Sequence, residues 1–281
     1  MNPEKLLENT RLAFIGCGVM AESIVAGMLR QNLVRPAQIA TSHPRSNRRD
    51  ELKLKYKVEV YEHNAEAVAA LPEDDSIIVL CVKPQRIGGV LDEIKAAVKP
   101  SQIIVSIIAG AKIEYISEAL NNQLIVRTMP NTPSQIGAGM TAWTCAEAVS
   151  AEQKSQVKTL LSALGKELYV ENENQIDMAT ALSATGPTYV FMMMEAMTDA
   201  GVHLGFSREV SKELVQQTML GSTLFAIESH KHPAELRNMV TSPGGTSAEA
   251  IYQMEKGGLR TVLSKAIYAA YQKAVDLGRK R

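Results

Sequence analysis

The sequence lacks three features that would each point to a particular class of protein. It carries 30 lysine and arginine residues against 30 aspartate and glutamate residues, so neither nucleic acid nor an anionic membrane is an expected partner. No apolar run approaches the roughly 18 residues that a membrane-spanning helix needs. The first ten residues contain Glu4 and Glu8 and no apolar core, so we expect neither a signal peptide nor a transit peptide.

Cysteine is scarce, and the side chains that could bind a metal are scattered. Cys17, Cys81 and Cys145 are odd in number and widely spaced, which predicts reduced thiols in a cytoplasmic protein. His230 and His232 are two residues apart, so on a helix they would point in different directions. We therefore expect no metal site.

The strongest positive signal is a glycine turn near the start of the chain. An apolar run ending at Ile15 predicts a buried strand, and residues 20–29 have the period of a helix. Between them, Gly16, Gly18 and Ala21 fit the pattern G-x-G-x-x-G/A, in which Gly16 permits a tight turn and Gly18 lets a phosphate approach. Free amides and the helix dipole favour a pyrophosphate there. An ordinary turn is the alternative, but the position between strand and helix favours dinucleotide binding.

The region after the second predicted strand indicates which dinucleotide binds. No aspartate or glutamate occurs between Val34 and Arg49, where such a side chain would hold the ribose hydroxyls of adenosine. Hydroxyl and basic side chains stand there instead: Ser42, His43, Arg45, Ser46 and Arg48. Because arginine presents a planar fork of donors to phosphate oxygens, this cluster suits a 2′-phosphate. The alternative is a basic turn before a helix that starts near Asn47. We predict NADPH as the cofactor, and acceptance of NADH is left open.

Strand and helix signals alternate over the first part of the chain and then stop. Apolar runs predict strands at residues 12–15, 39–41, 58–61, 76–82, 102–108, 124–128, 142–145 and 167–170. This alternation favours a doubly wound parallel sheet, with the proline-rich loop 129–133 at the carboxyl end of a strand, where ligands usually bind. We predict an α/β Rossmann-type dinucleotide-binding domain over 1–171 and an all-α domain over 172–281.

The helical part contains a segment with almost no polar face. Helical spacing predicts helices at 175–183, 189–203, 208–229, 234–240 and 259–277, with a turn at Ala184–Pro187. The segment Tyr189–Met197, YVFMMMEAM, must be buried on most sides. Packing inside one helical domain would satisfy it. Because a second subunit is a natural cover, we expect an obligate dimer.

A second glycine-rich segment precedes another predicted helix. Gly244 and Gly245 are followed by Thr246 and Ser247, and Thr246 with Glu249 fits a capping box. The glycines beside helix amides would equally form a nest for a carboxylate. The residues alone leave both alternatives open, and they support a nicotinamide oxidoreductase with a small carboxylate substrate.

Several segments together resemble pyrroline-5-carboxylate reductase. The most specific are residues 240–250, VTSPGGTSAEA, and residues 181–189, ALSATGPTY. The glycine turn, VKP at 82–84 and MPNTP at 129–133 match as well, so the resemblance covers essentially the whole chain. Ser247 stands where the family usually has threonine. Serine keeps the hydroxyl, and we expect function to be retained.

The resemblance implies an activity and a set of cofactor contacts. NADPH would deliver a hydride to the C=N carbon of L-1-pyrroline-5-carboxylate, giving L-proline in the last step of proline biosynthesis. The pyrophosphate would lie on the turn made by Gly16, Gly18, Val19 and Met20. The implied contacts with adenosine and its phosphate are Ser42, His43, Arg45 and Asn64. Those along the path to the nicotinamide are Cys81, Val82, Lys83, Pro84 and Ala109. Asn64 also has the alternative of a helix N-cap.

The resemblance also implies how the imino acid substrate is held. Its carboxylate would rest on backbone amides around Gly245, Thr246 and Ser247, with Ser242 in the same segment. The Ser247 hydroxyl would lie near the ring nitrogen and orient the substrate, and it would not act as a general base. Glu173 is a further candidate contact. In the family the site lies where one subunit's nucleotide domain meets helices of the dimer partner, and a ring of dimers is common.

Two other functions compete with this interpretation. A β-hydroxyacid dehydrogenase has the same order of domains, but it needs a lysine base on the first helix after the junction, and residues 175–187 contain no lysine. A non-catalytic nucleotide-binding paralogue stays open, although the intact segment 243–245 argues against it.

Overall fold

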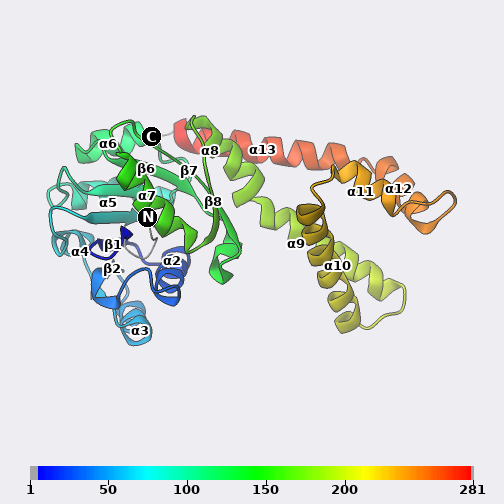
Figure 1. Ribbon diagram of the computed structural model, residues 1–281, viewed down its shortest axis with the longest axis horizontal. Coiled ribbons are helices and arrows are strands. Elements are labelled where there is room, and N and C mark those ends of the chain that lie inside the picture. The colour runs from blue at the N-terminus through cyan, green and yellow to red at the C-terminus, as the bar shows by residue number, and fades with distance from the viewer. Residues whose placement is uncertain (1–5, 280–281) are drawn as a thin grey trace. The chain divides into compact units, whose positions relative to one another are not determined.

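The computed structural model describes residues 6–279, and the chain forms two compact units (Figure 1). The first unit contains the residues through Thr185 and those from Ala270 onward, and the second is Gly186–Ala269. The domain boundary predicted between residues 171 and 172 stays a prediction, because compact units need not coincide with domains.

The first unit is built on one eight-stranded sheet with the order β3-β2-β1-β4-β5-β6-β7-β8. The strands are β1 (Arg11–Ile15), β2 (Ile39–Ser42), β3 (Glu59–Tyr61), β4 (Ser76–Leu80), β5 (Ile103–Ser106), β6 (Ile125–Met129), β7 (Gly139–Cys145) and β8 (Gly165–Tyr169). The order reverses between β1 and β4, and at such a point loops on the two sides part to leave room for a ligand. The predicted Rossmann-type doubly wound sheet is confirmed.

The prediction of a parallel sheet is wrong for one pair of strands near its edge. Strands β1 to β6 are parallel, but β7 is antiparallel to β6, and β8 is parallel to β7. The connection from β6 to β7 covers only residues 130–138 and includes the short 3-10 turn η3 (Thr132–Ile136). A parallel neighbour needs a crossover of a dozen residues or more, so this short loop turns the chain back. The helix α7 (Ala151–Ser162) supplies such a crossover between β7 and β8.

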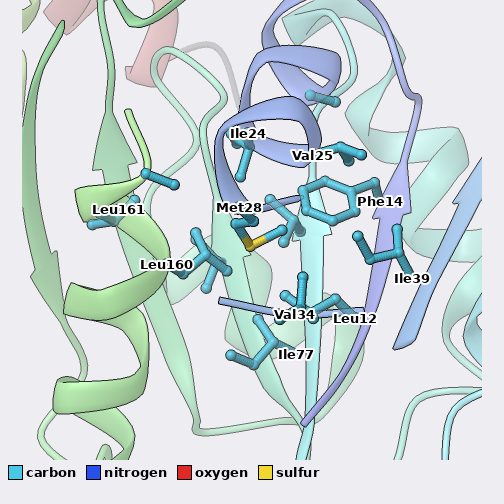
Figure 2. Close-up of a cluster of buried hydrophobic side chains, with 14 of the residues drawn as sticks. Leu12, Phe14, Ile24, Val25, Met28, Val34, Ile39, Ile77, Leu160 and Leu161 are labelled. Carbon is cyan, nitrogen blue, oxygen red and sulfur yellow. The ribbon is translucent and has the colours of Figure 1, made fainter. Parts of the chain in front are cut away.

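Helices cover both faces of this sheet. They are α2 (Val19–Arg30), α3 (Ser46–Tyr56), α4 (Asn64–Ala69), α5 (Ile87–Ile94) and α6 (Ile113–Leu120), together with α7. On one face, Phe14, Met28 of α2 and Leu160 of α7 belong to one buried cluster, and Figure 2 shows Met28 between the other two. On the other face, Ile15 packs among residues of α4, α5 and α6. Because successive strand residues face opposite sides, β1 contributes to both cores and is completely buried after Arg11.

The end of the helix α13 (Leu259–Arg279) belongs to this first unit. Ala274 is buried, and the backbone of Leu277 lies so close to Gly110 that a Cβ on Gly110 would approach it to 2.8 Å. Gly110 also has a φ of +72°, which favours glycine.

The second unit is helical, as predicted. It contains α9 (Gly186–His203), α10 (Arg208–Ser229), α11 (Pro233–Met239), α12 (Thr246–Lys256) and the first part of α13. The helices α9 and α10 approach closely where Gly201 faces Ser211, since a Cβ on Gly201 would lie 2.6 Å from Ser211 Oγ. No helix among residues 6–279 is long and apolar enough to cross a membrane.

The described residues 6–279 leave the apolar helix α9 largely exposed. Phe191 is 60% exposed and Met192 is 65% exposed, and no residue of α9 is buried. Packing inside a single helical domain therefore does not satisfy this segment. A patch of large apolar side chains that stays in water is typical of a surface that associates with another protein.

The predicted turn at Ala184–Pro187 is replaced by a bulge between two helices. Helix α8 (Asn174–Ala179) runs into the π-helical turn η4 (Thr180–Ala184), and only Thr185 separates this turn from α9. The Thr185 amide donates to the carbonyl of Thr180 at 2.9 Å, five residues back. Pro187 causes no break because a proline is tolerated in the first turn of a helix, where its missing amide has no helical partner.

Candidate active site

The glycine turn lies at the carboxyl end of β1, beside the reversal in strand order. Gly16 has a φ of +81°, and a Cβ on it would lie 2.5 Å from Val82 Cγ1. Its amide donates to Ser42 Oγ at 3.2 Å. Both the backbone conformation and the contact with Val82 therefore require glycine at position 16.

The start of α2 is open in front of this turn. Gly18 is its N-cap and contributes no side-chain capping bond, while Val19, the first helical residue, is 62% exposed. A Cβ on Gly18 would meet nothing closer than the carbonyl oxygen of Gly16 at 4.0 Å. An uncapped, accessible helix start of this kind fits a pyrophosphate.

Ser42 and Asn64 connect the turn to the neighbouring strand ends. Ser42 Oγ, besides accepting from Gly16, donates to Asn64 Oδ1 at 2.7 Å. The backbone amide and Nδ2 of Asn64 each donate to the Glu93 carboxylate at 2.6 Å. His63 is the N-cap of α4 and Asn64 is its first residue, so the N-cap alternative for Asn64 is wrong.

The basic cluster borders a hollow of about 290 Å³ next to the glycine turn. Its lining residues are Gly18, Val19, Glu22, His43, Arg45, Asn47, Arg48 and Glu51. Within residues 6–279, the Arg45 side chain has no hydrogen-bond or ion-pair partner, and it precedes α3, which begins at Ser46. Burial and the neighbouring Arg45 charge lower the pKa of His43. The hollow therefore offers an uncompensated guanidinium to an anion such as a 2′-phosphate.

Arg48 differs from Arg45 because its charge is already balanced. Its guanidinium forms a short ion pair with Glu22, a second with Glu51 at 2.6 Å, and donates to the Cys17 carbonyl at 3.4 Å. Burial opposes ionisation of Glu22, but hydrogen bonds from Arg48, Lys55 and Tyr56 outweigh it and lower its pKa to about 2. Sequence reasoning missed Glu22. The only signal was an acidic residue in the first turn of a helix, which the dipole alone would explain.

The residues predicted along the nicotinamide path follow the next two strands of the sheet. Cys81 comes directly after β4, and its amide donates to the carbonyl of Ile15 at 2.9 Å. Val82 lies against Gly16, and Lys83 and Pro84 begin the short turn η2 (Pro84–Arg86). Ala109 follows β5 and packs against a small cluster of Met129, Ala142 and Ile176. The ends of β1, β4 and β5 thus bring these residues to one edge of the sheet.

Two cysteines lie at this edge, Cys17 and Cys81. Burial raises the pKa of Cys17 to about 12 and also raises the pKa of Cys81. Cys17, Cys81 and Cys145 are all free, as the sequence predicts. A protonated thiol is a poor nucleophile, so we do not expect Cys17 or Cys81 to act as one.

The predicted substrate segment contains an uncapped helix start. Gly245 is the N-cap of α12, its amide donates to the Ser242 carbonyl at 3.0 Å, and it makes no side-chain cap. The capping box of Thr246 and Glu249 is therefore wrong: Thr246 is already helical, and Glu249 accepts from Gln253. In the part of the chain that is described, the amides of Thr246 and Ser247 have no hydrogen-bond partner. The anion-nest alternative remains.

Glu173, the other predicted substrate residue, is engaged inside the first unit. Its Oε1 accepts from Arg127 Nη1 at 3.0 Å and from the Ile113 amide at 2.9 Å. Arg127 Nη2 also donates to Asp177 Oδ1 at 2.5 Å. Sequence reasoning missed Arg127 and Asp177, although a charged residue inside the apolar strand IVRTM was a usable signal.

Together, the doubly wound sheet, the left-handed glycine and the open start of α2 define a dinucleotide-binding protein of the Rossmann type. Two family models match the chain: NADP oxidoreductase, coenzyme F420-dependent, over residues 11–110, and pyrroline-5-carboxylate reductase dimerisation over residues 173–277. The chain is 42% identical to pyrroline-5-carboxylate reductase from Pseudomonas aeruginosa, covering 96% of this chain and 98% of the relative.

Solved structures of pyrroline-5-carboxylate reductases also match the chain. The structure of a pyrroline-5-carboxylate reductase from Coxiella burnetii matches with a TM-score of 0.85 and 34% identity, covering 95% of this chain and 98% of that one. The Plasmodium falciparum pyrroline carboxylate reductase, solved with NADP bound, matches with a TM-score of 0.87 and 31% identity, covering 96% and 98%. The chain belongs to the pyrroline-5-carboxylate reductase family, which confirms the resemblance in the sequence.

Proposed function

We propose that the protein reduces L-1-pyrroline-5-carboxylate to L-proline with NADPH, the last step of proline biosynthesis. The observation that carries the proposal is the open glycine turn with the unpartnered Arg45 beside it, in a chain of this family. The match of residues 11–110 to an NADP oxidoreductase family supports NADPH as the cofactor. NADPH, when bound, supplies the hydride.

In this proposal the first unit holds the cofactor at several points. The turn formed by Gly16, Gly18, Val19 and Met20 binds the pyrophosphate through backbone amides. Ser42, His43 and Arg45 bind the adenosine phosphate, and Asn64 lies on the adenosine side. Cys81, Val82, Lys83, Pro84 and Ala109 line the path toward the nicotinamide.

The segment before α12 holds the substrate. The free amides of Thr246 and Ser247, with Gly245 and Ser242 beside them, bind the carboxylate, and the Ser247 hydroxyl orients the ring nitrogen. Glu173 would contact the substrate only through Oε2, because Oε1 is taken by Arg127 and Ile113.

The chain needs no general base for this chemistry. A protonated cyclic imine is already electrophilic, so the protein must mainly fix the imine carbon against the hydride donor. Correct placement of two reactants can lower a barrier by on the order of 7–11 kcal/mol. Hydride addition neutralises the iminium charge, so the site gains rate only from contacts that favour the transition state over the bound imine.

We also propose that the helical unit forms a dimer, with a ring of dimers as the larger assembly, and that the protein acts in the cytoplasm. The exposed apolar face of α9 and the match of residues 173–277 to a dimerisation domain support self-association. The three free cysteines agree with a reducing compartment.

The test is to incubate the purified protein with NADPH and pyrroline-5-carboxylate and to follow the absorbance of NADPH, with proline measured as the product. We expect NADPH to be consumed in proportion to the proline formed. Tight NADPH binding without turnover would instead indicate the non-catalytic paralogue.

A further inference from the structure

Arg127 is the largest side chain that the first unit buries completely. It lies on β6, only 1% exposed, and its two terminal nitrogens reach two carboxylates, those of Glu173 and Asp177. Asp177 is itself 5% exposed. We call Arg127, Glu173 and Asp177 the β6 clamp. It fastens the start of α8 and the residue before it to a central strand.

Stability alone is a weak reason for such an arrangement. Burying charges costs free energy that their attraction only partly returns, and a well-packed apolar trio often does as well or better. In addition, Arg127 Nε has no hydrogen-bond partner among residues 6–279. The guanidinium offers something that an apolar contact lacks: a planar fork that fixes both the distance and the orientation of two carboxylates.

The clamp sets the position of a wall next to the proposed nicotinamide path. Ile176, adjacent to Asp177, is completely buried in the cluster with Met129 and Ala142. Ala109 packs against this same cluster. A shift of α8 would therefore be transmitted to Ala109 through a close-packed group of side chains.

The C-terminal end of the segment 174–184, which comprises α8 and η4, is also held in place by contacts. Ala179 and Ala184 pack on the Met129 cluster, and Asn131 Nδ2 donates to the Ser183 carbonyl at 3.4 Å. Asn131 Oδ1 accepts from the Met140 amide at 2.9 Å, which ties this loop to β7. Between the two fastenings lies the π-helical turn η4, and turns of this kind occur frequently at functional sites.

We propose that Arg127 and Asp177 are positioning residues for hydride transfer, acting through Ile176 and Ala109 on the nicotinamide side of the site. This inference rests on the proposed function. It assigns the ion pair to the chemical step, because a displacement of about 1 Å can slow a reaction by about a hundredfold. Binding of the adenosine end is unaffected, since Ser42 ends β2 and Arg45 lies in the loop that follows it, away from β6 and α8.

The decisive variant is Asp177→Ala, with Asp177→Asn as its conservative counterpart and Glu59→Gln, in an exposed ion pair with Arg11, as the control. We expect Asp177→Ala to lower kcat by about tenfold or more. The KM for the imine and the Kd for NADPH should stay within about twofold of the wild type, since their contacts remain. The isotope effect with deuterated NADPH should rise because hydride transfer becomes rate-limiting. Asp177→Asn keeps an acceptor for Arg127 and should recover most of kcat.

A second readout does not depend on turnover. Amide hydrogen exchange over residues 174–184 should become faster in Asp177→Ala than in Asp177→Asn or Glu59→Gln, measured with and without NADPH. If Asp177→Ala does not fold, Arg127→Lys decides the question, because lysine keeps the charge and loses the fork. A lowered kcat with unchanged NADPH binding then supports the proposal.

A kcat equal to that of the wild type in the folded variant, with only a lower Tm, would overturn the inference. Failure of the proposed function would give a different result, because the wild-type protein itself would bind NADPH and leave the imine unreduced. The two failures are therefore distinguishable in one set of measurements.

Discussion

Ser42 donates a hydrogen bond from Oγ to Asn64 Oδ1 at 2.7 Å while the same oxygen accepts from the Gly16 amide at 3.2 Å. One hydroxyl thus joins the proposed pyrophosphate turn to the residue proposed for the adenosine side. Ser42, the last residue of β2, thus bridges the residue that follows β1 and a residue that follows β3.

Ser42→Ala should weaken NADPH binding by about two- to tenfold, since a lost neutral hydrogen bond is worth roughly 0.5–1.5 kcal/mol. The loss should be similar for NADH, because the hydroxyl acts on the turn that both cofactors use. Fluorescence titration measures both Kd values. Ser155→Ala, which removes an exposed hydroxyl on α7, is the matched control. An unchanged Kd for both cofactors would contradict the role given to Ser42.

Arg45→Asp should shift the preference of the enzyme from NADPH toward NADH. The unpartnered guanidinium would be replaced by a carboxylate that repels a 2′-phosphate and accepts from ribose hydroxyls. Because hydrogen bonds to charged groups are worth about 1.5–3 kcal/mol, the ratio of kcat/KM for the two cofactors should fall by about ten- to a hundredfold.

Lys53→Asp makes the same charge change on an exposed residue of α3 and serves as the control for Arg45→Asp. It should leave the ratio close to that of the wild type. If the ratio does not move in Arg45→Asp, the 2′-phosphate is bound elsewhere.

Ser247→Ala should raise the KM for the imine by about tenfold, because a substrate hydrogen bond is lost, and should leave the Kd for NADPH unchanged. Ser247→Thr introduces the residue usual in the family and should keep the activity. Steady-state kinetics with each substrate varied in turn would separate the two effects. A larger effect on NADPH than on the imine would show that the substrate site is misplaced.

The stability of the first unit should depend on pH through Glu22. Its pKa falls from 4.5 to about 2 on folding, so the stabilisation is fully present above about pH 4.5 and is lost as the pH falls toward 2. Because the group is partly exposed, we expect a contribution of only about 1 kcal/mol. Urea unfolding at about pH 6 and about pH 3 should therefore show a smaller difference in Glu22→Gln than in the wild type.

Glu147→Gln removes an exposed carboxylate and should retain the pH dependence of the wild type. An equal pH dependence in Glu22→Gln and the wild type would show that the pair with Arg48 does not stabilise the fold.

The elements that local sequence patterns determine were predictable, and the long-range pairings were not. Gly16 and Gly18 between an apolar strand and a helix predicted the turn, because backbone conformation there is decided by a few adjacent residues. The direction of β7 depends on the short loop after β6. Predicting where strands occur does not by itself predict the direction in which they pair. The strand 142–145 was correctly expected as part of the sheet, but not its antiparallel pairing.

In the candidate site, too, features set by neighbouring residues were predictable, and features set by long-range contacts were not. The basic cluster around Arg45 could be recognised from the types of residue in the sequence. Nothing in the neighbouring sequence, however, shows that Arg48 is ion-paired and Arg45 is not. The difference comes from Glu22, which is 26 residues from Arg48 in the chain and reaches it only in the folded unit. The capping box at Thr246 failed because a fit to a pattern does not fix the residue at which the helix begins, which is decided by the backbone of Gly245.

The return of α13 to the first unit has a consequence for biosynthesis. Gly110 lies against Leu277, so this corner of the nucleotide-binding unit is completed by a segment translated more than 150 residues later. When a nascent chain has been synthesised only as far as β8, Gly110 lacks its contact with Leu277. The contact can form only after the helices α8 to α13 have been synthesised. Final closure of the first unit is then a late event, coupled to synthesis of the second.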